Sequence, residues 1–106
     1  MSIDLTLEVS VSVEHIDTGQ AGSRAACPLA LAIRDELKRL SGIAWERVMV
    51  SEYGVYALWD SQGLGTRWHH SPESRTFVTL IDSGQKTAAA MLAGRVGKFR
   101  LTRDEA

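Results

Sequence analysis

The chain has little of several residue types, and each shortage removes a class of protein. Cys27 is the only cysteine among the 106 residues, so no disulfide can form within the chain and a reducing compartment is expected. No apolar run approaches the roughly 20 residues of a membrane span. The N-terminus carries acid rather than the basic region of a signal peptide. These absences predict a cytoplasmic protein without a membrane segment.

The chain also lacks an excess of either charge. Lysine and arginine number 12 and the acidic residues 13, which leaves a net charge of -1. This balance argues against a strongly basic nucleic-acid-binding protein and against a wholly acidic mimic of DNA. Apolar residues make up 44% of the sequence, an ordinary share for a globular protein. The length predicts a single α+β domain over residues 1–106.

Hydrophobic periodicity predicts the secondary structure. Residues 3–13 alternate strictly between apolar and polar side chains, which is typical of a strand with one buried face. Pro28 and the Ser71-Pro72 pair are typical helix starts. The expected elements are a strand at 3–13, a helix at 28–41, strands at 47–51 and 55–59, a helix at 72–82 and a strand at 94–102. Residues 60–71 read as a loop, and residues 86–93 fit either a helix or a loop.

This βαββαβ order is that of the ferredoxin-like fold, a four-stranded antiparallel sheet with two helices on one face. In such a fold the last strand lies beside the first. Lys98 and Arg100 would then face the same open side of the sheet as Asp4 and Glu8, where ion pairs across the strands are expected.

Cys27 is the one residue that suggests covalent chemistry. It stands at a helix start, where free amides and the helix dipole lower a thiol pKa. His15, His69 or His70 could serve as a base, and the same four residues have side chains that zinc accepts. Their spacing matches no zinc motif, and a lone cysteine is usually a small buried apolar residue. We therefore predict no enzyme, no cofactor and no metal site, with a Cys27-dependent thiol enzyme as the further alternative.

Candidate partner-binding residues occur in three segments. Trp68 lies in a segment with a neighbouring arginine, and tryptophan and arginine dominate interface hot spots. Trp68 is either a plug over the core or an exposed anchor. The full candidate set consists of Arg67, Trp68, His69 and His70, the basic residues Arg95, Lys98, Arg100 and Arg103, and the acidic residues Asp4, Glu8 and Glu14.

Two segments carry a family resemblance. The stretch Val13-Glu14-His15-Ile16-Asp17-Thr18-Gly19, followed by Cys27-Pro28-Leu29-Ala30-Leu31-Ala32-Ile33, resembles small uncharacterised proteins encoded by bacteriophages and prophages. Those proteins typically continue a strand as H-I-x-x-G and reach C-P-[IVL]-A-x-A at a helix start. The resemblance covers about the first forty residues. The family provides no catalytic residue that could be assigned to a position in this sequence.

What the resemblance implies is a setting and a mode of action. Small phage accessory proteins commonly bind and disable a host protein, and anti-CRISPR proteins are the sharpest example. We accordingly expect a phage-encoded protein in the bacterial host cytoplasm that inhibits a host defence complex by steric and electrostatic occlusion. The partner would be a host protein or ribonucleoprotein complex, bound by a monomer or a homodimer. The alternative from the residues alone is a nucleic-acid-binding protein that uses the basic C-terminal segment, with affinity that falls steeply with salt.

Overall fold

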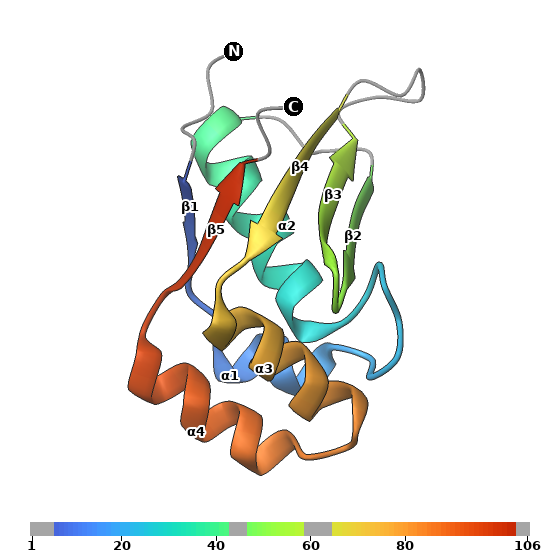
Figure 1. The fold of residues 1–106 in the computed structure, drawn as a ribbon, viewed down its shortest axis with the longest axis vertical. Coiled ribbons are helices and arrows are strands. Elements are labelled where there is room, and N and C mark those ends of the chain that lie inside the picture. The colour runs from blue at the N-terminus through green and yellow to red at the C-terminus, as the bar shows by residue number, and fades with distance from the viewer. Residues whose placement is uncertain (1–5, 43–46, 59–64, 104–106) are drawn as a thin grey trace.

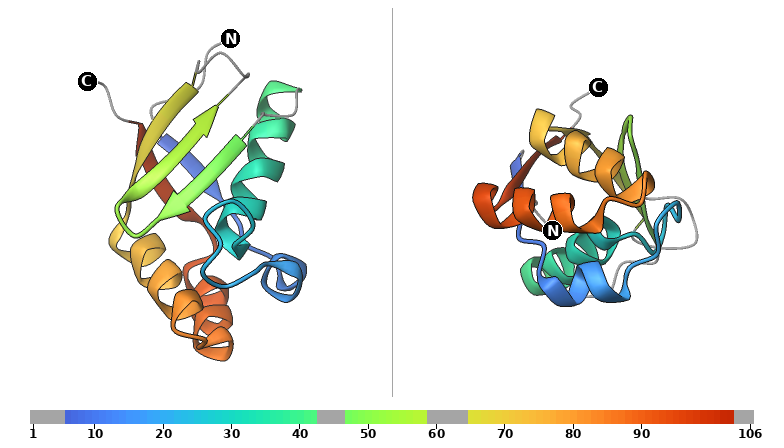
Figure 2. Two further views of the ribbon diagram at one scale, coloured as in Figure 1. Left: turned by 90° about the vertical axis from the view of Figure 1, so that its right-hand side faces the viewer. Right: turned by 90° about the horizontal axis from the view of Figure 1, so that it is seen from below.

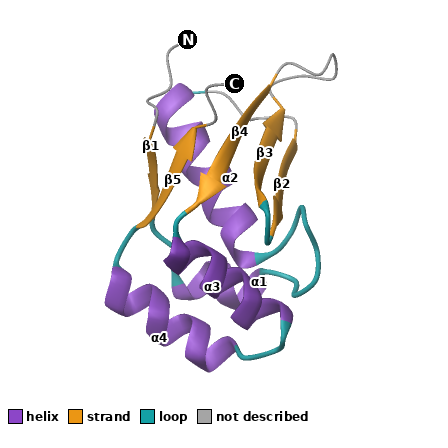
Figure 3. Cartoon of the chain, viewed as in Figure 1, coloured by secondary structure: helices purple, strands orange, loops and turns teal. Residues whose placement is uncertain are grey.

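The computed structural model describes residues 6–42, 47–58 and 65–103 as an α+β fold (Figure 1). An antiparallel sheet has the strand order β1-β5-β4-β3-β2. Helices lie behind this sheet and at its lower end (Figure 3). The strands are β1 (Thr6–Val9), β2 (Arg47–Ser51), β3 (Gly54–Leu58), β4 (Gly65–His70) and β5 (Phe99–Arg103). The helices are α1 (Val13–Thr18), α2 (Pro28–Ser41), α3 (Pro72–Asp82) and α4 (Lys86–Val96).

The α+β class is confirmed, but the ferredoxin-like prediction is not. The described sheet has five strands rather than four, because residues 65–70 of the expected loop form β4 between β3 and β5. The first and last strands are neighbours as expected, with Glu8 opposite Arg100. Yet β1 lies at the edge of the sheet and β5 inside it. The described helices number four rather than two, since α1 and α4 add to the two expected ones.

The starts and ends of α2 and α3 follow the predicted signals. Pro28 and Pro72 occupy first helical positions, where a missing N–H leaves no hydrogen bond unmade. The Ser71 hydroxyl caps α3 by accepting the Ser74 amide hydrogen at 3.1 Å. Gly42 ends α2 with a φ of 74°, a left-handed conformation that glycine adopts without strain.

The two faces of the sheet are unlike. On the inner face, Trp68 and the β5 residues Phe99 and Leu101 are buried against helices. Phe77 of α3 meets Phe99 with 5.1 Å between the ring centroids. On the other side no described helix covers the sheet, as the left view of Figure 2 shows with α2 on one side only. We call this uncovered side the outer face, and its described residues are Thr6, Glu8, Arg47, Met49, Ser51, Gly54, Tyr56, Leu58, Gly65, Arg67, His69, Arg100 and Thr102.

The edge of the sheet at β2 is partly occupied by the loop between α1 and α2. The Val50 amide donates a hydrogen bond to the Arg24 carbonyl oxygen at 2.8 Å. The same loop is tied to the end of α3, because the Gly22 amide donates to Asp82 Oδ1 at 3.2 Å. A strand edge that would otherwise present free amides is thereby paired with the loop.

Candidate functional site

Cys27 lies in the core of the protein, where it caps a helix. Its side chain is 4% exposed, and Sγ accepts the Ala30 amide hydrogen at 3.5 Å. Burial is the main influence on this thiol and raises its pKa, which outweighs the lowering effect of the Ala30 and Leu29 amides. The thiol therefore stays protonated at neutral pH, the opposite of an activated nucleophile.

A cleft of about 260 Å³ borders Cys27, and no imidazole lines it. Its lining residues are Gly22, Ser23, Arg24, Cys27, Val50, Ser51, Glu52, Tyr53, Val78 and Asp82. Among the described residues no group of three or more His, Cys, Asp or Glu side chains is placed to hold a metal ion. The alternatives of a thiol enzyme and of a zinc site with His15, His69 and His70 thus gain no geometric support.

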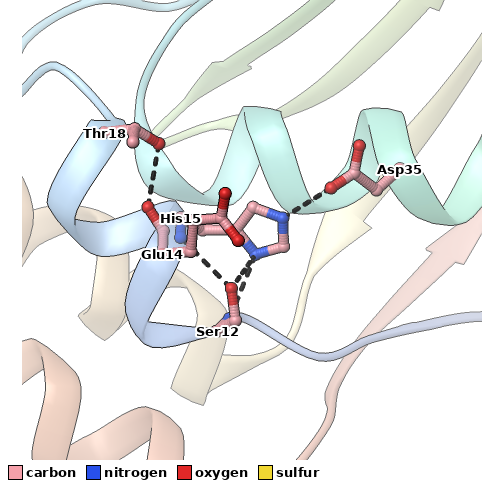
Figure 4. Close-up of polar contacts among 5 residues, drawn as sticks. All are labelled: Ser12, Glu14, His15, Thr18 and Asp35. Atoms are coloured by element: carbon pink, nitrogen blue, oxygen red, sulfur yellow. Dashed lines mark hydrogen bonds and ion pairs between the residues drawn. The ribbon is translucent and has the colours of Figure 1, made fainter.

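His15 joins a Ser–His–Asp set that the sequence reading did not identify (Figure 4). Its Nδ1 accepts the Ser12 amide hydrogen at 3.0 Å and lies 3.1 Å from the Ser12 hydroxyl oxygen. Nε2 lies 2.7 Å from Asp35 Oδ2. Because Nδ1 accepts an amide hydrogen, the ring hydrogen sits on Nε2 and is donated to the carboxylate.

The geometry of this set is that of a helix start rather than a catalytic triad. The Ser12 oxygen accepts the His15 backbone amide hydrogen at 3.2 Å, so Ser12 and His15 form a reciprocal capping box for α1. Asp35 belongs to α2, so the histidine also ties α1 to α2. The spacing of Ser12 three residues before His15 was the available sequence signal, with histidine in the place usually held by glutamate or glutamine.

His70 points inward and is held on both ring nitrogens. Nε2 donates to the Ser51 carbonyl oxygen at 2.6 Å, and Nδ1 lies 2.8 Å from the hydroxyl oxygen of the fully buried Ser74. Burial is the main cause that lowers the pKa of His70; the hydrogen bond to the Ser51 carbonyl opposes it, and the positive charge of Arg75 lowers the pKa further. His70 is therefore neutral at pH 7 and links β4 to the end of β2 and to α3.

The predicted partner-binding segment at residues 67–70 is divided between the two faces of the sheet. Trp68 is 0% exposed, so it is a core plug, and the alternative of an exposed anchor is wrong. His70 faces inward with it. Arg67 and His69 lie on the outer face, since successive residues of a strand point to opposite sides.

The remaining predicted contact residues also fail to form one surface. Arg100 lies 3.5 Å from Glu8 on the outer face, which bears out the expected cross-strand pair. Arg103 is opposite Trp68 on the inner face and is half-buried. Arg95 lies in the last turn of α4, Lys98 is exposed in the α4–β5 connection, and Glu14 is exposed on α1. Asp4 lies outside the described residues.

The outer face brings together residues that the sequence reading had not connected. Arg67, Tyr56 and Met49 are cross-strand neighbours in a row over β4, β3 and β2. The Arg67 guanidinium carbon lies 5.5 Å from the centre of the Tyr56 ring, a cation–π contact. Leu58 and Arg47 are neighbours in the next row. This set depends on the pairing of β3 with β4, which was not predicted.

Comparison with protein-family models, with curated proteins and with solved structures finds no match to this chain. None of the described helices has the length and apolar character that crossing a membrane requires.

Proposed function

We propose that this chain is a binding protein without a catalytic centre, and that the outer face of its sheet is the contact surface. One observation carries this proposal: the outer face presents Arg47, Tyr56 and Arg67 with no described helix over them. Aromatic and arginine side chains are the residues that dominate interface energies, so this cluster supports a contact role for the outer face.

The candidate reactive groups support a role without catalysis. Cys27 is buried with a raised pKa, Ser74 is fully buried, and the Ser12 oxygen is engaged by a helix amide. Each of these groups has a structural partner that accounts for its position. We therefore propose that the protein acts by binding another macromolecule.

The particular version that we propose is an accessory protein of phage type that inhibits a host defence complex by occlusion, plausible targets being CRISPR effector complexes. The resemblance of residues 13–33 to phage and prophage proteins motivates this version. An acidic surface is not used in it, because Glu8 is opposite Arg100 and Glu14 lies on a different element. The outer face would instead attach to an anionic part of the target.

A retention experiment with purified CRISPR effector complexes tests this function. The chain is immobilised at low salt beside two double variants, Arg47→Glu with Arg67→Glu on the outer face and Arg34→Glu with Arg95→Glu on helices α2 and α4. We expect the wild type and the helix variant to retain a complex and the outer-face variant to lose it. If no complex is retained by any of them, the anti-CRISPR version is wrong; equal retention by both variants would rule out the outer face as the contact surface.

A further inference from the structure

We propose that the part of the outer face formed by β2, β3 and β4 binds single-stranded nucleic acid. The inference rests on the proposed function, because it uses the same contact surface and names the chemical class of its ligand. It differs from the alternative based on the basic C-terminal segment, since Arg95, Lys98 and Arg103 play no part in it.

The first support is the stacking surface. Tyr56 is half-buried at the centre of the row. Arg67 lies against this ring, and a planar guanidinium is itself a surface on which bases stack. Met49 extends the same row on the other side of Tyr56. Bases of any type stack on such a surface because every base has a π-face.

The second support is charge. Arg47 and Arg67 are exposed, and neither forms an ion pair with a carboxylate among the described residues. The carboxylate that the described strands place on the outer face is Glu8, which lies on β1 and pairs with Arg100. Among the described strand residues, the β2–β4 part of the face carries Arg47 and Arg67 and no carboxylate, and the one acid lies in the β1–β5 part. Phosphate groups crossing β2–β4 would meet arginine on both sides of the tyrosine.

The shape of the surface selects a single strand. Neighbouring strands lie about 4.8 Å apart, so the row from Arg67 to Met49 spans about 10 Å of sheet. The major groove of a B-form duplex admits an α-helix or a two-stranded ribbon, which is narrower than this three-stranded face. The unstacked bases of a single strand can lie on such a face directly. An acidic peptide would satisfy the arginines but would leave Tyr56 and Met49 without a stacking partner.

Fluorescence anisotropy with labelled single-stranded RNA and DNA oligonucleotides of mixed sequence tests the inference. Duplex DNA of the same sequence and an oligoglutamate peptide serve as competing ligands. We expect micromolar binding of a single strand at about 50 mM salt, with weaker binding of the duplex and the peptide. Tyr56→Ala should weaken single-strand binding by about tenfold, because loss of stacking on one aromatic ring costs about that much.

The salt dependence separates a phosphate contact from a general charge effect. Replacing Arg47 and Arg67 together by Gln should reduce the slope of log K against log salt by about 1.4, since each single-strand phosphate contact contributes about 0.7. The matched control, Arg34→Gln with Arg95→Gln, removes the same charge from the helices and should leave the slope unchanged. Equal effects of the two double variants would overturn the proposal, as would preference for the peptide or the duplex. Absence of any single-strand binding would also overturn it.

Failure of this inference and failure of the proposed function give different results. If a retained complex stays bound after nuclease treatment and no oligonucleotide binds, the outer face contacts protein, so the inference is wrong while the function stands. If oligonucleotides bind and no host complex is retained, the inference stands and the inhibitor function is wrong. Circular dichroism of each variant shows whether the variant is folded, so that a loss of folding is not mistaken for a loss of binding.

Discussion

Adjacent residues of β4 allow a direct comparison of the two faces of the sheet. Trp68 is fully buried on the inner face, whereas its neighbour Arg67 is exposed on the outer face. Further along the strand, His70 is held inside by Ser74 and the Ser51 carbonyl, and His69 lies outside. The inner residues stabilise the fold, and the outer residues are exposed. Neighbouring residues of β4 therefore have different roles: the buried ones contribute to stability, and the exposed ones belong to the proposed contact surface.

The comparison predicts that substitutions of Trp68 and of Arg67 differ most in how much they lower the free energy of unfolding. Trp68→Ala should lower the free energy of unfolding by about 3–5 kcal/mol, because it opens a cavity among buried residues. Arg67→Ala should lower it by no more than about 1 kcal/mol, the scale of an exposed cation–π contact. Urea unfolding of both variants measures the two losses. Similar losses would show that the two faces do not divide stability from contact.

A substitution at Gly65 tests whether every position of the outer face can be changed without loss of stability. A Cβ added to Gly65 would clash with the Ala57 carbonyl oxygen, so β4 would have to move away from β3. Gly65→Ala should therefore cost about 1–3 kcal/mol, as forced overpacking does. The control Gly94→Ala lies in α4 with no atom within 4 Å of its Cβ, and it should stabilise the protein by about 0.5–1 kcal/mol. A neutral Gly65→Ala variant would contradict the close approach of the two strands.

The inward-facing His70 should make the stability of the protein depend on pH. The folded state lowers the pKa of His70 below its ordinary value of 6.5, so the unfolded chain binds this proton at a higher pH than the folded one. The contribution of neutral His70 to stability is complete above pH 6.5 and falls as the pH drops through that value toward the folded pKa.

Urea unfolding between about pH 7.5 and pH 5 measures this response. His70→Gln should flatten the decline in stability at acid pH, because the group responsible is removed. An unchanged acid response in His70→Gln would show that another group is responsible.

The smallest effect is expected at the ion pair of the outer face. Glu8 and Arg100 are 49% and 68% exposed in their side chains and lie 3.5 Å apart, so solvent screens their attraction. A double-mutant cycle of Glu8→Gln and Arg100→Gln should give a coupling below about 1 kcal/mol that shrinks further with added salt. A larger coupling that resisted salt would mean that the outer face also contributes to stability.

The parts of the fold that could be predicted had strong local signals. Pro28, Gly42 and Ser71-Pro72 mark helix ends through backbone chemistry that does not depend on distant contacts. The strands predicted at 47–51 and 55–59 likewise correspond to β2 and β3, which pair as an antiparallel hairpin.

The missed elements depend on tertiary packing. In β4 only Trp68 is fully buried, and Gly65 with two histidines gives the segment the composition of a loop. The alanine-rich α4 is stabilised by its packing on α3 and α1. Because β4 was missed, the Arg67–Tyr56 contact could not be foreseen, whereas the Glu8–Arg100 pair needed only adjacent first and last strands.

The hydrogen bond from the Val50 amide to the Arg24 carbonyl has a consequence for self-association. A bare strand edge is a template onto which further chains can add, the route by which β-proteins form fibrils. Here the edge strand β2 already has part of its backbone hydrogen-bonded to the loop between α1 and α2. That loop is held in turn by the hydrogen bond from the Gly22 amide to Asp82 at the end of α3. The molecule can thus expose a broad sheet to its surroundings while restricting stepwise polymerisation from this side.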